Sequence, residues 1–198
     1  MAEAPDTRPT LLMRLRERGA DSSWSQFVEI YAPLLYKFAR KQGLQDADAA
    51  DVTQDALRAV AQALPQLEYD SQRGSFRGWL FTVVRSKLAT FRQRQAKQMV
   101  GAGEADLRDQ PAPAVDEEEV WRQEYRQRLF NWAATKVEAA VEPKTWQAFW
   151  QTATLGRGAK DVAAELGLSL AAVYMARSRV LARIKAEIEQ VQGESADE

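Results

Sequence analysis

Apolar side chains recur at spacings of three and four residues along most of the chain, which is the pattern of amphipathic helices. The pattern predicts a short helix over 10–18, stopped by Gly19, and a longer apolar face over 24–38. Pro33 lies inside that face, so it either kinks one helix or opens a second. The sequence shows no β-type alternation and no hairpin signal, so we predict an all-α fold.

The segment DADAADVTQDALRAVAQALP, residues 46–65, predicts a helix with an apolar face and an acidic face. Asp48, Asp51 and Asp55 lie on the acidic side. Acids near a helix N-terminus are stabilised by the helix dipole, by about 0.3–1 kcal/mol each. Asp55 lies about two turns in, where that effect has faded. The sequence therefore leaves two explanations open, ordinary N-terminal acids or a ridge that binds a basic partner.

Residues 74–95, GSFRGWLFTVVRSKLATFRQRQ, contain no acid. The apolar spacing predicts a helix whose buried stripe includes Phe76, Leu80, Val84 and Leu88. The other side is predicted to present Arg77, Phe81, Thr82, Arg85, Ser86 and Arg92. Positive charge follows phosphates, and aromatic faces stack on unpaired bases, so this side suits single-stranded nucleic acid. A core helix with a solvated basic side is the alternative.

Residues 99–115 mix Gly, Pro, Ala and Asp with little to bury, which is typical of a linker. An acidic run at 116–119 then begins a helix that extends to Glu142, and Pro143 begins the next helix. We predict that the Trp and Phe residues of these helices form the core of a second small domain. The predicted organisation is two helical domains, 10–98 and 116–192, joined by a flexible linker, 99–115, and followed by a tail, 193–198.

Residues 159–185 fit a helix-turn-helix, with a small residue in the first helix, Gly167 in the turn and a branched apolar residue in the second helix. Ser169 can cap the second helix. The second helix is predicted to run through Val173, Val180, Leu181 and Ile184, and its exposed positions are predicted to be Ala171, Ala172, Tyr174, Met175, Arg177 and Ser178. Arg157, Lys160, Arg179, Arg183 and Lys185 make the surroundings basic. Such a helix fits the major groove of DNA, and an ordinary helical hairpin is the alternative.

Composition narrows the classes of function. The net charge of the 198 residues is −1, which argues against a uniformly basic nucleic-acid binder but permits segregated charge. The chain has neither Cys nor His, which excludes thiol nucleophiles, imidazole acid–base catalysis and zinc sites built from these residues, and we expect no cofactor. No apolar run reaches membrane-spanning length and none of signal-peptide size begins the chain, so we expect a cytoplasmic protein without membrane insertion.

Together these features resemble an extracytoplasmic-function (ECF) sigma factor, the promoter-specificity subunit of bacterial RNA polymerase, over about residues 24–185. FVEIYAPLLYKFARKQG is similar to the first conserved helices of that family, and DADAADVTQDALRAV to its core-polymerase-binding helix. FRGWLFTVVRSKLATFRQRQ resembles the segment that melts and reads the −10 promoter element, and the helix-turn-helix resembles the −35 module. YDSQRGSFRGWL further resembles an ECF group common in planctomycete-type bacteria.

The resemblance implies a role for each surface. It implies that core RNA polymerase is bound by Asp48, Asp51, Gln54 and Asp55. It implies that the −10 strand is held by Arg77, Phe81, Arg85, Ser86, Lys87, Arg92 and Arg94. It implies that the −35 duplex meets Arg157, Lys160, Ser169, Ala171, Ala172, Tyr174, Arg177, Ser178 and Arg179. An anti-sigma factor is a further expected partner. Many members carry Asn where Ser86 stands, so a different base preference is expected there.

Two other functions compete with this one. A helix-turn-helix regulator that works without polymerase would need a dimer surface, and the sequence has no heptad seam to supply it. An enzyme acting on nucleic acid would need a metal bound by Asp48, Asp51 and Asp55, which are spaced along one helix face rather than around a cleft. Because the chain also has acidic segments at 116–119 and 187–198, we hypothesise that intramolecular or anti-sigma contacts mask the basic helices until polymerase binds.

Overall fold

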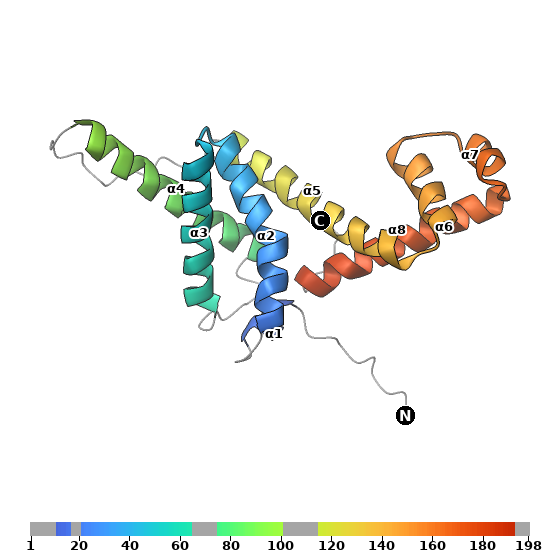
Figure 1. The fold of residues 1–198 in the computed structure, drawn as a ribbon, viewed down its shortest axis with the longest axis horizontal. Coiled ribbons are helices and arrows are strands. Elements are labelled where there is room, and N and C mark those ends of the chain that lie inside the picture. The colour runs from blue at the N-terminus through green and yellow to red at the C-terminus, as the bar shows by residue number, and fades with distance from the viewer. Residues whose placement is uncertain (1–10, 17–20, 65–74, 101–114, 193–198) are drawn as a thin grey trace, which may run out of the picture. The chain divides into compact units, whose positions relative to one another are not determined.

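The structure, a computed structural model, describes residues 11–16, 21–64, 75–100 and 115–192 (Figure 1). All regular structure in these ranges is helical, which confirms the all-α prediction. The chain divides into two compact units, called here the N-terminal unit (11–128) and the C-terminal unit, whose described part is 129–192. None of the described helices combines the length and the apolar character needed to cross a membrane.

The N-terminal unit contains α1 (Leu11–Arg16), α2 (Asp21–Lys41), α3 (Asp46–Ala63), α4 (Phe76–Val100) and the first half of α5 (Val115–Ala140). In Figure 1, α2 and α3 run side by side, and α3 also packs on α4. The apolar faces expected from residue spacing supply the buried side chains. They include Phe27, Tyr31, Leu34 and Phe38 of α2, Val52, Ala56 and Val60 of α3, and Phe76, Leu80, Val84 and Leu88 of α4.

One helix, α2, continues through Pro33, so the proposal that this proline opens a second helix is wrong. Proline has no N–H and leaves the carbonyl four residues earlier, that of Glu29, without its helical donor. The guanidinium of Arg128 donates to the Glu29 carbonyl from α5, and its Nε–H donates to the carbonyl of Ile30 at 2.9 Å. A donor from another element thus satisfies the backbone acceptor that Pro33 leaves open.

The first half of α5 completes the N-terminal core. Trp121 and Tyr125 are buried, and the Trp121 ring lies 5.2 Å from the Phe38 ring and 5.8 Å from the Phe81 ring, between centroids. The sequence analysis placed these aromatics in the second domain, because they follow the linker-like segment. A helix of 26 residues spans roughly 39 Å, so α5 contributes to both compact units. Most of the predicted linker, 101–114, lies outside the described residues.

The C-terminal unit contains the rest of α5, α6 (Pro143–Phe149), a π-helical turn η3 (Trp150–Thr154), α7 (Ala159–Leu166) and α8 (Leu170–Gln192). Pro143 occupies the first turn of α6, as expected. Both α6 and α7 pack on α8, and the buried cluster is Ala148, Val162, Ala163, Val173 and Ala176.

Leu181 of α8 is exposed, with 42% of its surface in contact with solvent. The buried positions of α8 are Val173, Ala176, Val180 and Ile184, at spacings of three and four. The next residue along a helix is rotated by about 100°, which carries Leu181 away from the buried stripe marked by Val180. Leu181 therefore adds to the exposed apolar surface of α8.

Candidate nucleic-acid interface

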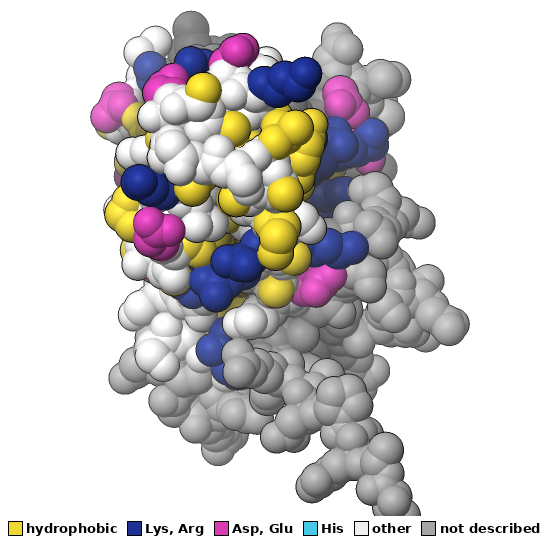
Figure 2. Space-filling view, turned by 90° about the vertical axis from the view of Figure 1, so that its right-hand side faces the viewer, with side chains coloured by type: hydrophobic (Ala, Val, Ile, Leu, Met, Phe, Trp, Pro, Cys, Tyr) yellow, Lys and Arg dark blue, Asp and Glu magenta, His cyan; other side chains and the backbone are white. Residues whose placement is uncertain are grey.

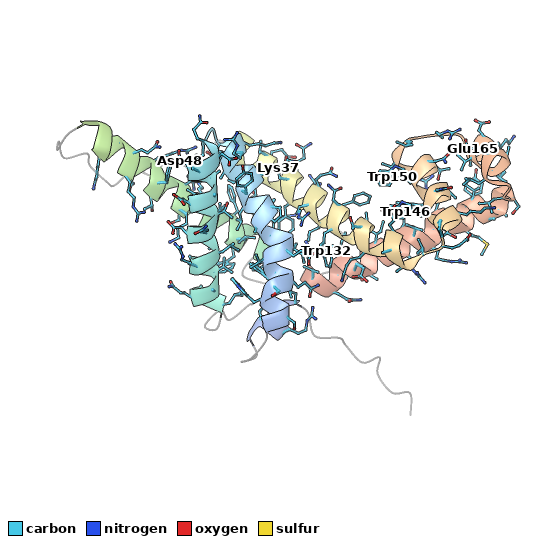
Figure 3. All side chains as sticks on the ribbon, in the orientation of Figure 1. Lys37, Asp48, Trp132, Trp146, Trp150 and Glu165 are labelled. Carbon is cyan, nitrogen blue, oxygen red and sulfur yellow. The ribbon has the colours of Figure 1, made fainter. Side chains whose placement is uncertain are left out.

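The acidic residues of α3 lie along one side of the helix, away from its buried face. Asp51 and Gln54 are exposed, whereas Asp48 (labelled in Figure 3) and Asp55 are half-buried. Arg58, one turn further along, bonds to Asp55 at 2.7 Å and to the Gln54 side chain at 3.2 Å. An exposed pair of this kind adds about 1 kcal/mol or less. Arg58 thus partly neutralises one end of the ridge, whereas Asp51 is exposed to solvent.

The basic residues of α4 divide into two sets on different sides of the helix. Lys87 and Arg94 line a groove of about 390 Å³ between α3 and α4, together with Asp51, Gln54 and Asp55. Arg85 and Arg92 instead face α5, where the Glu117 carboxylate lies 3.9 Å from each guanidinium. The two residues of each set are seven positions apart, which is close to two helical turns, so both lie on the same side of α4. Residues assigned by sequence to polymerase and to DNA therefore share the α3–α4 groove.

Phe81 is the candidate whose predicted exposure is wrong. Its side chain is 8% exposed and contacts the rings of Phe38 and Trp121, at 5.9 and 5.8 Å between centroids. The prediction failed because the face of α4 that carries Phe81 is covered by α5, a helix that the sequence assigned to another domain. In this structure Phe81 presents no free ring to a base. Ser86 and Thr82 on the same helix are exposed, as expected.

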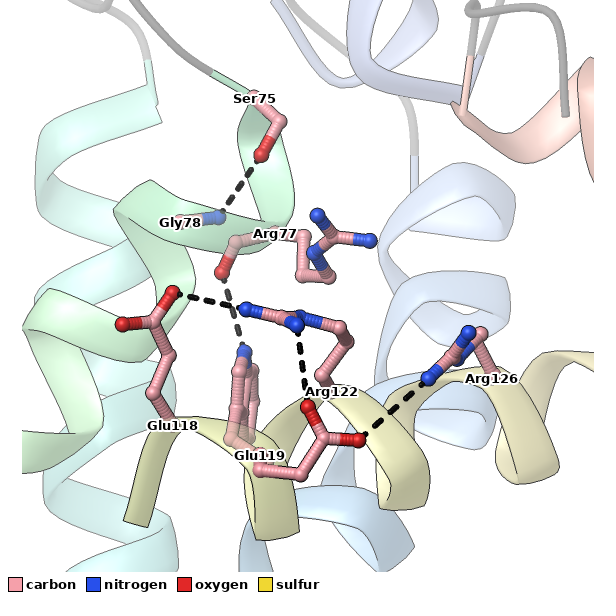
Figure 4. Close-up of polar contacts among 8 residues, drawn as sticks. Ser75, Arg77, Gly78, Glu118, Glu119, Arg122 and Arg126 are labelled. Atoms are coloured by element: carbon pink, nitrogen blue, oxygen red, sulfur yellow. Dashed lines mark hydrogen bonds and ion pairs between the residues drawn. The ribbon is translucent and has the colours of Figure 1, made fainter. Parts of the chain in front are cut away.

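Sequence analysis missed Glu117 and Trp121 as neighbours of the basic face. The indole N–H of Trp121 donates to the Arg77 carbonyl at 3.2 Å. Figure 4 shows this bond together with the ion pairs that Glu118 and Glu119 form with arginines of the same helix, α5. The acidic run 116–119, followed by an aromatic residue, was the available signal. It was interpreted as a helix start, because residues 101–114 separate it from α4 in sequence.

The helix-turn-helix forms as predicted. Gly167 adopts a left-handed conformation, with φ of +65°, and ends α7. The N–H of Leu168 returns to the Ala163 carbonyl at 2.9 Å, which closes the turn. Ser169 Oγ accepts from the N–H of Ala172 at 3.1 Å, so it caps α8 as expected. Val173 anchors the second helix in the shared core, which fixes the direction of its outer face.

The exposed face of α8 carries both apolar and basic side chains. Tyr174 is 55% exposed and Met175 60% exposed, and Ala171, Arg177, Ser178 and Arg179 are exposed as well, whereas Ala172 is half-buried. Figure 2 shows hydrophobic side chains beside Lys and Arg on this side of the C-terminal unit. Leu170 and Leu181 extend the exposed apolar surface. Apolar groups at the start of such a helix suit thymine methyls, and the arginines suit phosphates.

Two of the basic residues around the helix-turn-helix, Arg157 and Arg183, have partners inside the C-terminal unit. Arg157 forms an ion pair with Glu165 at 2.7 Å; the hydrogen bond raises the pKa of Arg157 and lowers that of Glu165. Arg183 donates to the carbonyl of Ala140 at 3.2 Å. Lys160 and Arg179 are exposed, and no contact of theirs is among those described. Since exposed pairs are weak, Arg157 can exchange its partner for a phosphate.

A second groove, of about 920 Å³, lies within the C-terminal unit. Its walls include Trp146, Trp150, Glu138, Leu155 and Glu165. Trp146 and Trp150 stack at 5.6 Å between ring centroids, and both are half-buried (Figure 3). The sequence analysis placed these rings fully in a core, so they are more exposed than expected. In the described residues no group of three or more Asp, Glu, Cys or His is placed to hold a metal ion.

Comparison with known proteins finds a family match for the part of the chain that carries the acidic side of α3 and the basic side of α4. Residues 27–98 match the family described as Sigma-70 region 2, a range that begins in α2 and ends in α4. Over 92% of its length the chain is also 27% identical to the RNA polymerase sigma factor CnrH of Cupriavidus metallidurans, and the match covers 95% of that protein. The chain therefore contains a match to Sigma-70 region 2 and is similar over most of its length to an RNA polymerase sigma factor.

A solved structure, described as CnrH in complex with the cytosolic domain of CnrY, also matches the chain. The match covers 90% of this chain and 95% of the solved chain, at 23% identity and a TM-score of 0.36. The Sigma-70 region 2 match includes the α3 acids and most of basic α4, whereas the helix-turn-helix lies beyond residue 98.

Proposed function

We propose that the protein is an ECF-type sigma factor, which binds core RNA polymerase through the acidic side of α3 and holds the −10 promoter strand with the basic residues of α4. The observation that carries the proposal is the Sigma-70 region 2 match over 27–98, which contains both surfaces. In α3, Asp51 and Gln54 are the exposed members of the acidic set, so they are the first contacts with a basic partner. In α4, Arg85 and Arg92 form the strand-holding side, and Lys87 and Arg94 lie beside the polymerase-binding acids.

The helix-turn-helix is proposed to read the −35 duplex. Ala171, Tyr174 and Met175 offer apolar contacts near the start of α8, and Arg177 and Arg179 supply positive charge. Such a face discriminates by thymine methyls and by DNA shape more than by hydrogen bonds to base edges. We accordingly propose that promoter specificity depends more on the −10 element, where Ser86 is exposed among the basic residues.

The remaining assignments are also proposals. The functional boundaries are 10–98 for the polymerase and −10 domain and 116–192 for the −35 domain, around a linker of 99–115. The motif YDSQRGSFRGWL supports a planctomycete-type ECF group, and its first residues, 69–74, lie outside the described part of the chain. The protein would act in the cytoplasm, with an anti-sigma factor as a regulator. A regulator that works without polymerase is not favoured, because it would have no use for region 2.

Binding to core RNA polymerase tests the proposed function. Purified protein is mixed with sigma-free core enzyme and passed through a size-exclusion column. We expect the chain to elute with the core enzyme, and a primary sigma factor added in excess to displace it. Elution only at the free position, with no displacement, would mean that the α3 acids serve another partner.

A further inference from the structure

The groove of about 920 Å³ in the C-terminal unit is called here the Trp groove, after Trp146 and Trp150 in its walls. Its volume lies within the range of about 300–1,000 Å³ that is usual for small-molecule sites. Such sites are lined mostly by apolar and aromatic side chains with a few polar groups, and the Trp groove has this character. The role proposed above for the C-terminal unit uses the exposed face of α8 and leaves the two rings without a function.

The two tryptophans lie on a helix that changes its winding at the groove. Trp146 belongs to α6, and Trp150 begins the π-helical turn η3, in which the N–H of Leu155 donates to the Trp150 carbonyl at 3.1 Å. Residues four apart lie on one side of a helix, and the two rings stack at 5.6 Å between centroids. Both are half-buried, so each keeps part of its surface open at the groove. Single π-helical turns are rare and are frequent at functional sites, so η3 is a second indication of a binding site.

The charges of the Trp groove favour a cation. Glu165 is balanced by Arg157, which pairs with it at 2.7 Å and also bonds to the Gln151 side chain. Glu138 is exposed in the groove wall, and among the described residues it takes part in no ion pair. A carboxylate that is not neutralised therefore lies in the same groove as two indole rings. Carboxylates attract cations, and Trp is the side chain whose ring face binds cations best.

The same chemistry already operates within the C-terminal unit. The Lys136 ammonium lies 4.5 Å from the ring centroid of Trp132, which is a cation–π contact. In the part of the chain that the structure describes, no lysine or arginine lies over the rings of Trp146 and Trp150 in this way. These two rings are therefore available to a cation that comes from outside the chain.

We propose that the Trp groove binds an organic cation, with an apolar body that covers Trp146 and Trp150 and a positive group that faces Glu138. The inference goes beyond the proposed function, because it requires neither polymerase nor promoter DNA. An anionic molecule with the same body gains the apolar contact but is repelled by the Glu138 carboxylate. The Trp groove should therefore select its ligand by charge as well as by shape.

Indole N–H signals of the nitrogen-15-labelled full chain locate the ligand. The probe is benzyltrimethylammonium, and benzylsulfonate, which has the same aromatic body and the opposite charge, is the matched control. The chain has six tryptophans, and the spectra of Trp146→Phe and Trp150→Phe assign the two signals of the groove. We expect the cation to shift these two signals and to leave those of Trp24 and Trp79, in the N-terminal unit, unchanged. We expect benzylsulfonate to shift none of them at the same concentration.

Glu138→Gln tests the carboxylate. The residue is exposed, so a change of nearly equal shape should leave the fold intact, and Glu118→Gln makes the same change on the same helix outside the groove. We expect benzyltrimethylammonium to bind Glu138→Gln several-fold more weakly than the native chain, and Glu118→Gln as tightly as the native chain.

Three results would overturn the proposed cation site. They are an absence of shifts at Trp146 and Trp150 with the cation, equal shifts with benzylsulfonate, and equal affinity of Glu138→Gln and the native chain. None of these measurements contains polymerase or DNA, so their outcome is separate from that of the core-binding experiment.

Discussion

Glu124 and Arg128 are single charged residues that decide how α5 is held to α2. The carboxylate of Glu124 is 7% exposed and faces Lys37 and Lys41, whose side chains remain largely in solvent. Burial raises the pKa of Glu124, but the hydrogen bonds and charges of the two lysines outweigh it, and the net pKa is lowered. Burial lowers the pKa of Arg128, and the charge of Glu29 opposes that shift. Both residues lie one or two turns from Trp121, so they position the indole.

Glu124→Gln tests this anchor. Loss of the ion pairs should reduce the free energy of unfolding of the N-terminal unit by about 1 kcal/mol at neutral pH, since the exposed lysines regain water. Because the folded pKa is lowered, the contribution of Glu124 is present above the ordinary glutamate pKa and disappears as pH falls through the lowered value. Urea unfolding at neutral and acid pH should therefore show a difference between variant and native chain that shrinks in acid. A difference in unfolding free energy that does not change with pH would show that the ion pairs of Glu124 do not stabilise the fold.

Phe81 shows where sequence reasoning fails at the scale of one residue. Phe81 lies three residues before Val84 and seven before Leu88, so helical spacing places its ring near the buried stripe of α4. The prediction instead grouped Phe81 with Arg77 and Thr82 on the exposed side, which was wrong. What periodicity cannot say is which other helix covers the ring, because Trp121 packs on it from beyond residues 101–114.

At the scale of one element, the turn between α7 and α8 depends on a left-handed residue. Gly167→Ala should lower the free energy of unfolding of the C-terminal unit by about 1 kcal/mol, because a Cβ is strained at φ of +65° even though no atom lies within 4 Å of it. Gly78→Ala is the matched change in the helical interior of α4, where the added Cβ meets only Ser75 Oγ at 3.5 Å. It should leave stability unchanged or raise it. Thermal unfolding compares the two; equal destabilisation would contradict the special role of the turn.

The two basic sides of α4 should separate in function. Arg85→Ala with Arg92→Ala removes the side that faces Glu117, and should impair promoter opening far more than core binding. Lys87→Ala with Arg94→Ala is the comparison pair on the groove shared with the α3 acids, and should weaken core binding as well. Permanganate reactivity of promoter thymines reports opening, and co-elution reports core binding. If the first pair loses both activities equally, the division of α4 into two sides is wrong.

The acidic side of α3 has its own test. Asp51 is exposed and its charge contributes little to the fold, so Asp51→Lys should keep the helical circular dichroism and the unfolding midpoint of the native chain. It should weaken core binding by tenfold or more, on the order of the 1.4 kcal/mol or more that a reversed contact charge costs. Glu118→Lys makes an equal charge change away from the ridge and should bind core enzyme normally. If Asp51→Lys binds core enzyme as tightly as the native chain, the acids of α3 are better explained as ordinary helix N-terminal acids.

The sequence predicted which segments are helices better than it predicted which helices pack against one another. The helix start at Pro143 and the cap at Ser169 lie where local chemistry places them, because capping and proline effects act within one turn. Asp46 and Asp48, which the sequence offered as N-caps of α3, lie inside the helix instead, and Gln45 precedes it. Continuity of α2 through Pro33 did not follow, since it depends on a donor from Arg128 nearly a hundred residues away. The division of Arg85 from Lys87 likewise depends on which helix lies on each side of α4.

On the scale of the whole molecule, charge is segregated rather than absent. A net charge of −1 results from an acidic α3 and an acidic start of α5, set against the basic residues of α4 and α8. The separation of acidic from basic segments could be predicted from the sequence, and it suggested the hypothesis that contacts mask the basic helices. The contacts of Glu117 with Arg85 and Arg92 accord with that hypothesis for the run 116–119. The second half of the acidic segment 187–198, residues 193–198, lies outside the described residues.

Run-off transcription with purified core RNA polymerase tests the central claim most directly. Fragments of genomic DNA from the source organism are transcribed by core enzyme with and without the chain, and the transcript starts are mapped. The account predicts transcripts that require the chain, with starts that share one −10 and one −35 sequence upstream. Transcripts no more abundant than with core enzyme alone, or starts with no common upstream sequence, would contradict it.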